Sequence, residues 1–164
     1  MEIEPFGYID PDELAEFYSG EVDINGRNIA VDLNFESTTT SISELEFVSV
    51  VLLDMGVKVD AAFDGISDDF DLDEDSVTAK NYLVYHFEHL PDEHKIELFG
   101  TINIDEVDRQ AFLSVLELTR VGLYPEEEEA FLVFNIRFPA QYTNYLIAVT
   151  FNREGYLSAM TMES

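Results

Sequence analysis

Residues 131–138 read FLVFNIRF and residues 144–151 read NYLIAVTF, and these two runs decide the fold. Leu132, Phe134 and Ile136 recur at every second position of the first run, and the second run alternates in the same way. Alternating apolar residues with many aromatic and β-branched side chains are typical of strands. Residues 112–124 predict a strand before these runs, and residues 156–162 predict one after the turn at 152–155. The last third of the chain therefore predicts an antiparallel meander, covered by helices on at least one face because both faces carry apolar residues.

A second strand signal lies near the N-terminus, where apolar residues alternate from Val22 to Phe35 on both sides of Asn25-Gly26. This dipeptide favours the two-residue type I′ turn that closes a β-hairpin. With that turn, the apolar side chains of both arms lie on one face.

The segment before the hairpin and the segments between the hairpin and the meander predict helices. Asp10-Pro11-Asp12-Glu13 has a capping residue followed by proline, which predicts a short helix ending at Gly20. Apolar residues at spacings of three and four predict a helix over 43–67, capped by Ser43 and interrupted at Gly56. Further helical segments are predicted over 76–90, 91–99 and 105–111.

Together these elements predict an α+β fold in a single domain spanning residues 1–164. An antiparallel sheet of five to six strands combines the N-terminal hairpin with the C-terminal meander. Three to four helices pack on one face of that sheet.

The composition restricts the class of protein. The chain of 164 residues has no cysteine and is 46% hydrophobic, with 13 Phe and 8 Tyr. The missing cysteines exclude disulfides and thiolate zinc sites, and the apolar content is too high for a disordered chain. The sequence shows neither a signal peptide nor a membrane-spanning run, so we expect a soluble cytoplasmic protein.

The net charge of −27 arises from 35 acidic residues against eight Lys and Arg. Nucleic acids and anionic membranes repel such a chain, so we expect neither as a partner. Two interpretations remain open: the charge serves solubility, or it forms a surface for a basic protein such as a nuclease toxin.

An acidic run between Ser67 and Asp75 includes Asp69, Asp71 and Asp73 at the spacing of the first three ligands of a calcium loop. However, Glu74 occupies the position that requires glycine, and Lys80 occupies the position of the bidentate glutamate. The run is therefore not a calcium-binding motif, although its carboxylates remain candidates for binding.

Catalytic motifs are not apparent in the sequence. His86, His89 and His94 do not form an HExxH motif, and no nucleophile elbow or glycine-rich phosphate loop occurs. We therefore expect no cofactor and favour a binding function over catalysis. The alternative is a small-molecule or metal-binding enzyme that uses His86, His89 or Arg120.

Charged residues beside the predicted meander are the other candidates for binding. Arg120 and Arg137 lie within strand patterns, where arginines usually pair with a carboxylate or lie on the wetter face of the sheet. The loop between them carries four acidic residues, Glu126, Glu127, Glu128 and Glu129. These six residues, with Asp69, Asp71 and Asp73, make up the predicted binding residues.

Several short motifs resemble a family of small acidic bacterial proteins that is classed only as a domain of unknown function. The motifs are Phe6-Gly7-Tyr8-Ile9-Asp10 with Tyr18 and the Asn25-Gly26 hairpin, Leu123-Tyr124-Pro125, Leu146-Ile147-Ala148-Val149, Gly155 and Met162-Glu163-Ser164. The resemblance implies a fold but no catalytic residues. Members of this family look like other small acidic bacterial proteins that neutralise toxins, which suggests an inhibitor or immunity function.

The sequence thus favours a non-catalytic domain that binds a basic protein. Such a domain should carry a contiguous acidic patch around a shallow apolar spot. The sequence leaves its oligomeric state open between monomer and dimer.

Overall fold

The hairpin predicted around Asn25-Gly26 is the outer part of a six-stranded sheet in the computed structural model, which describes residues 1–72, 75 and 78–164. Asn25 and Gly26 both have positive φ, as the type I′ turn requires. The strands are β1 (Glu2–Ile3), β2 (Gly7–Tyr8), β3 (Phe17–Ile24), β4 (Arg27–Asn34), β5 (Glu117–Leu123), β6 (Leu132–Arg137), β7 (Leu146–Phe151) and β8 (Leu157–Glu163).

The large sheet has the strand order β3-β4-β5-β6-β7-β8, so strands that are adjacent in the sheet are also consecutive in the sequence. The predicted α+β fold and the C-terminal meander are confirmed. The prediction of a wholly antiparallel sheet is wrong at one place, because β4 and β5 run parallel. Their connection runs from residue 35 to residue 116 and holds all the helices of the described chain, as a parallel connection requires.

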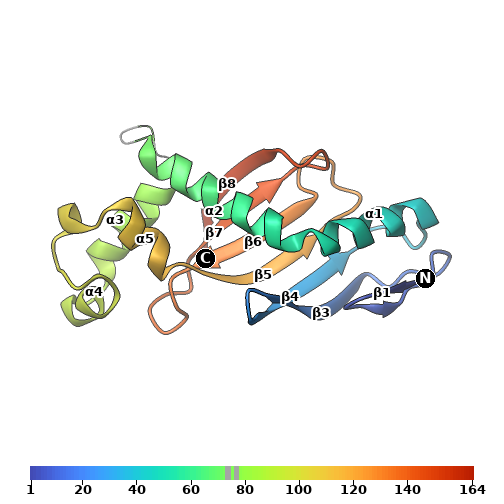
Figure 1. Cartoon of the computed structure of the whole chain (residues 1–164), viewed down its shortest axis with the longest axis horizontal. Helices are drawn as coiled ribbons and strands as arrows, with labels where there is room; N and C mark the ends of the chain where they lie inside the picture. The colour runs from blue at the N-terminus through green and yellow to red at the C-terminus, as the bar shows by residue number, and fades with distance from the viewer. Residues whose placement is uncertain (73–74, 76–77) are drawn as a thin grey trace.

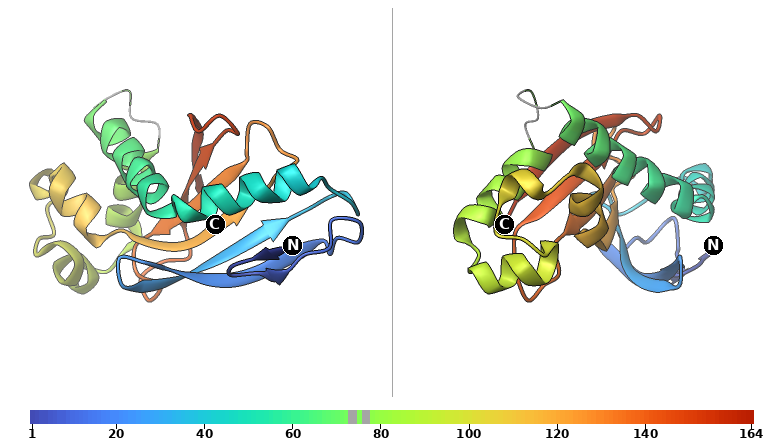
Figure 2. Two further views of the ribbon diagram at one scale, coloured as in Figure 1. Left: turned by 45° about the vertical axis from the view of Figure 1, so that its right-hand side comes forward. Right: turned by 60° about the vertical axis from the view of Figure 1, so that its left-hand side comes forward.

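Helices cover one face and one end of the sheet. They are α1 (Ile42–Leu53), α2 (Met55–Asp71), α3 (Ala79–His89), α4 (Asp92–Phe99), a short 3₁₀ helix η2 (Ile104–Glu106) and α5 (Arg109–Val115). Figure 1 shows α1 and α2 crossing the sheet, while α3, α4 and α5 gather at one end. Figure 2 shows α1 and α2 on one side of the strands. Side chains such as Val31, Val121 and Phe134 point to this side and are fully or almost fully buried.

Two helix boundaries differ from those predicted. Helix α1 is capped by Ser41, whose hydroxyl accepts from the Glu44 N–H at 3.1 Å, and not by Ser43. The predicted interruption occurs at Asp54, two residues before Gly56. The start of the first strand predicted for the meander, over 112–124, also differs, because residues 109–115 form α5 and β5 begins at Glu117.

The helix predicted between Asp10 and Gly20 does not form. The capping contacts of Asp10 are present, since its carboxylate accepts from the Asp12 N–H at 3.0 Å. The chain then turns away from a helix, because Leu14 donates its N–H to the Thr38 carbonyl and Glu16 accepts from the Phe35 N–H. Tertiary hydrogen bonds thus replace helical ones, and Gly20 lies inside β3.

His86 on α3 lies buried between the helices and the loop that follows β6. Its Nδ1 donates to the Tyr82 carbonyl at 2.7 Å, and its Nε2 accepts from the Thr143 hydroxyl at 2.7 Å. Both nitrogens of the neutral ring therefore have a hydrogen-bond partner. Burial lowers the pKa of His86, since the hydrogen bond to Tyr82 only partly offsets the loss of solvent and the nearby His89 adds to the shift.

We expect this buried imidazole to make the fold less stable in mild acid. The unfolded chain binds a proton at His86 more readily than the folded one. The unfolding free energy that depends on the neutral ring is therefore complete above about pH 7 and is lost as the pH falls below about 6.5. Between about pH 7.5 and 5.5, the wild type should lose about 1 kcal/mol more unfolding free energy than His86→Gln in urea titrations. His89→Gln, at an exposed position of the same helix, should keep most of the wild-type slope, because His89 makes the smallest of the three contributions to the pKa shift of His86; equal slopes for all three proteins would contradict the prediction.

No helix in the described part of the chain is both long and apolar enough to cross a membrane.

Candidate functional site

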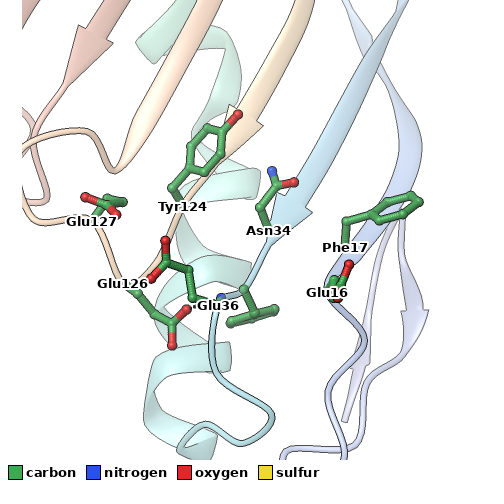
Figure 3. Close-up of a pocket in the computed structure, with 8 residues that line it drawn as sticks. Glu16, Phe17, Asn34, Glu36, Tyr124, Glu126 and Glu127 are labelled. Atoms are coloured by element: carbon green, nitrogen blue, oxygen red, sulfur yellow. Dashed lines mark hydrogen bonds between the residues drawn. The ribbon is translucent and has the colours of Figure 1, made fainter.

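The candidate site is a cavity of about 340 Å³ where β4 and β5 end. Because these strands are parallel, their last residues meet at one edge of the sheet. The cavity is lined by Glu16, Phe17, Asn34, Phe35, Glu36, Tyr124, Glu126 and Glu127 (Figure 3). We call its four carboxylates, Glu16, Glu36, Glu126 and Glu127, the acidic mouth.

An exposed aromatic side chain lies at one side of the acidic mouth, beside Glu16 (Figure 3). Phe17, the first residue of β3, is 63% exposed, although phenylalanine is usually buried. The ring of Phe35, at the end of β4, is buried and packs edge-on against Tyr18. The cavity therefore combines four carboxylates with one exposed aromatic side chain, which lies beside Glu16 and across the cavity from Glu126 and Glu127 (Figure 3).

Glu126 holds the two loops of the mouth together. Its carboxylate accepts from the backbone N–H of Glu36 and, at 3.1 Å, from that of Ser37. Hydrogen bonds from the Ser37 side chain and from both backbone groups lower the pKa of Glu126. The loop after β4 and the loop after β5 are thereby linked, and the carboxylate that links them stays ionised at neutral pH.

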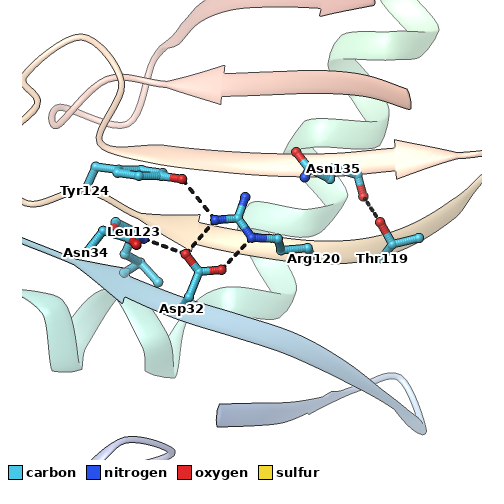
Figure 4. A network of polar contacts seen from close by, with 7 residues as sticks. All are labelled: Asp32, Asn34, Thr119, Arg120, Leu123, Tyr124 and Asn135. Carbon is cyan, nitrogen blue, oxygen red and sulfur yellow. Dashed lines mark hydrogen bonds and ion pairs between the residues drawn. The ribbon is translucent and has the colours of Figure 1, made fainter. Parts of the chain in front are cut away.

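Beside the mouth, on the face of the sheet away from the helices, lies a network centred on Arg120 (Figure 4). Its guanidinium donates from Nε and Nη2 to the two carboxylate oxygens of Asp32, at 2.5 and 2.6 Å. Nη2 also donates to the Tyr124 hydroxyl at 3.0 Å, and Asn34 donates to Asp32 at 2.5 Å. Burial disfavours the charged guanidinium, but the bonds to Asp32 and Tyr124 outweigh it and raise the pKa of Arg120.

Gly122 makes this network possible. Strand geometry puts Arg120, Gly122 and Tyr124 on the same face. A Cβ on Gly122 would lie 2.8 Å from the Tyr124 ring and 3.2 Å from Arg120 Nη2. The missing side chain therefore lets the Tyr124 ring lie over the strand and reach Arg120.

The predicted binding residues of the glutamate loop divide into two pairs. Glu126 and Glu127 line the mouth. Glu128 and Glu129 are exposed, and their backbone carbonyls accept hydrogen bonds from the Arg153 N–H and the Ser158 hydroxyl. Arg120 adjoins the mouth through Tyr124, so the structure brings three of the predicted residues together.

The other predicted residues lie elsewhere. Asp69 accepts from the Thr78 and Ala79 N–H groups at the start of α3, at 3.3 and 2.7 Å, and Asp71 pairs with Arg109. Asp73 lies outside the described residues. Arg137 stands opposite Glu117 in the pairing of β5 and β6, and its Nε is buried without a hydrogen-bond partner.

The sequence reasoning missed six lining residues: Glu16, Phe17, Asn34, Phe35, Glu36 and Tyr124. All but Tyr124 come from the N-terminal quarter of the chain, and they reach the glutamate loop through the parallel β4–β5 pair. An acidic residue on each side of the hairpin, at 16 and 36, is a weak signal in a chain with 35 acidic residues.

Within the residues that the structure describes, no group of three or more His, Asp or Glu side chains is placed to hold a metal ion. His94 lies 3.9 Å from Glu93, and His89 bonds to the Tyr85 carbonyl at 2.7 Å.

Comparisons with protein-family models, with curated proteins and with solved structures found no match.

Proposed function

We propose that this chain is a non-catalytic protein-binding domain that inhibits or neutralises a basic protein, with the acidic mouth as its contact surface. The observation that supports the proposal is that four carboxylates and the exposed Phe17 line one cavity, in which no Lys or Arg takes part among the described residues. Two cations lie close to the mouth, and both are paired within the fold: Arg120 with Asp32, and Arg153, which also donates to the Pro125 carbonyl at 3.1 Å, with Glu44.

A lysine or arginine side chain of the partner fits this arrangement. Its charged end would lie among the carboxylates, and its methylene chain or guanidinium plane would lie against the ring of Phe17. No Lys or Arg is among the residues that line the mouth in the described chain. The net charge of −27 would also steer a cationic protein toward the domain and speed its association.

The proposal includes a cytoplasmic, soluble protein that acts on a protein and not on nucleic acid or a membrane. The absence of cysteine is compatible with a reducing compartment. The charge would repel phosphate backbones and anionic lipids, which makes a basic protein the better partner.

A charge-matched pair of variants tests the proposal. Glu16→Lys with Glu127→Lys reverses two carboxylates of the mouth, whereas Asp60→Lys with Glu88→Lys makes the same charge change at exposed positions of α2 and α3. Proteins captured from lysate of the source cells by each immobilised protein would be identified by mass spectrometry, and the main captured protein would then be purified and titrated. We expect a basic protein whose affinity falls about tenfold or more in the mouth variant, and less in the control variant.

Salt gives a second readout of the same interaction. Raising the ionic strength from about 50 to 300 mM should weaken wild-type binding strongly and the mouth variant less, because screening acts on the charges that the variant has removed. Equal affinities of the two double variants, or captured proteins with no excess of Lys and Arg, would count against the acidic mouth as the contact surface.

A further inference from the structure

A groove runs along α2 on the helix-covered side of the molecule, apart from the acidic mouth. It consists of two cavities, of about 320 and 600 Å³, that share Ala61. One wall is α2, and the other is the β7–β8 turn with the first half of β8; Figure 1 shows these elements side by side.

The α2 wall is a single stripe of the helix. The lining residues recur at intervals of one and three, which keeps them on one face; they are Asp54, Val57, Lys58, Ala61, Asp64, Gly65, Asp68, Asp69 and Leu72. At 1.5 Å per residue the stripe is about 27 Å long. This length matches a helix of about five turns lying parallel to α2.

Apolar side chains along the groove are unusually exposed. Val57 is 72% exposed, Val50 and Leu72 are each 55% exposed, and Leu157 is 44% exposed. Leu157 packs directly on the α2 backbone, since a Cβ on Gly65 would lie 2.6 Å from its Cδ1. Exposed apolar surface rimmed by polar residues is a mark of interaction sites.

The rim of the groove is acidic. Five carboxylates line it, against the two cations Lys58 and Arg153. Arg153 forms a bidentate pair with Glu44 at 2.7 Å and lies 4.6 Å from the Phe47 ring centroid, so its charge is already used within the fold. A second copy of this chain would bring two acidic rims together and be repelled, whereas a cationic partner is attracted.

A helix suits the groove better than an added strand. A strand would have to pair with the outer edge of β8, but Thr78 donates its hydroxyl to the Met160 carbonyl there at 3.0 Å. The wall near Phe131 and Phe151 presents side chains and a turn, with no strand edge. A helix satisfies its own backbone hydrogen bonds and needs only side-chain packing.

We infer that this groove binds an amphipathic helix of a protein partner, with aliphatic side chains on the buried face and Lys or Arg on its flanks. The inference rests on the proposed partner-binding function and adds a second contact surface of different chemistry.

The test uses a defined probe, a fluorescent 18-residue Leu/Lys peptide designed as an amphipathic helix, with binding followed by anisotropy at about 150 mM salt. Val57→Glu places a charge on the apolar wall, and Ile96→Glu places the same charge on an exposed apolar residue of α4. We expect Val57→Glu to weaken binding about tenfold, while Ile96→Glu stays within about twofold of the wild type. Ala61→Glu is the second groove variant, and circular dichroism confirms that each variant is folded.

Three outcomes would overturn the inference: no binding by the wild type, equal binding by Val57→Glu and Ile96→Glu, or equal binding of a Ser/Lys peptide, which carries the charge without the apolar face. A proline-interrupted Leu/Lys peptide that binds as well as the helical one would also overturn it, because the helix would then be unnecessary. Glu127→Gln should leave peptide binding within about twofold. Loss of peptide binding in the groove variants alone therefore separates this inference from the acidic mouth, which the capture experiment tests.

Discussion

The Phe138→Ala variant is expected to lose about 3–5 kcal/mol of unfolding free energy. Phe138 is fully buried just after β6. The rings of Tyr82, His86, Phe99 and Phe112 have their centroids 4.9–5.9 Å from its own. These rings come from α3, α4 and α5, so the substitution leaves a cavity where the end of the sheet meets the helices. Urea unfolding followed by circular dichroism measures the loss.

Two further variants calibrate the effect of removing Phe138. Phe138→Leu keeps most of the apolar volume and should cost about 1–2 kcal/mol. Tyr156→Ala removes an aromatic ring that is 68% exposed and should change the unfolding free energy by less than about 0.5 kcal/mol. If Phe138→Ala cost no more than Tyr156→Ala, the aromatic cluster would not be what fixes the helices to the sheet.

The parts of the fold that sequence patterns predicted are those set by neighbouring residues. The Asn25-Gly26 hairpin follows from two residues that tolerate positive φ. The end of α4 follows from Gly100, which has φ of 71° and closes the helix as a C-cap. The meander follows from alternation that continues through β6 and β7.

The N-terminal helix was predicted wrongly because a local signal competed with distant partners. The Asp10 turn forms as its sequence suggests, yet Leu14 and Glu16 make hydrogen bonds to residues more than 15 positions away. A short segment gains little from helical propensity alone, so tertiary hydrogen bonds and the burial of Leu14 decide its path.

The acidic mouth could be predicted only in part, because it also depends on contacts between residues far apart in the sequence. The glutamate loop was identified from the sequence, but its partners Glu16 and Glu36 depend on the parallel pairing of β4 with β5. That pairing joins strands separated by more than 80 residues, and alternation within a strand carries no information on the neighbouring strand. One arginine could be interpreted from its local sequence. Arg120 lies in a strand and pairs with the carboxylate of Asp32, as predicted for an arginine within a strand pattern.

The second large effect is expected at this Arg120 pair. Asp32→Ala removes the carboxylate that accepts two hydrogen bonds from the Arg120 guanidinium and one from the side-chain amide of Asn34. The side chains are 16% exposed for Asp32 and 36% exposed for Arg120, so solvent replaces part of the lost interaction. We therefore expect a loss of about 1–3 kcal/mol, below the cost of breaking a fully buried pair.

A double-mutant cycle with Arg120→Met separates the pair from its surroundings. If the ion pair is the main contact, the double variant should lose less than the sum of the single variants, with a coupling energy of about 1–2 kcal/mol in urea titrations. Glu21→Ala, at an exposed position of neighbouring β3, should show little coupling to Arg120→Met. Because the pair is partly shielded, about 1 M salt should reduce the coupling without abolishing it. A coupling energy near zero would mean that Tyr124 and Gly122, and not Asp32, set the position of the arginine beside the acidic mouth.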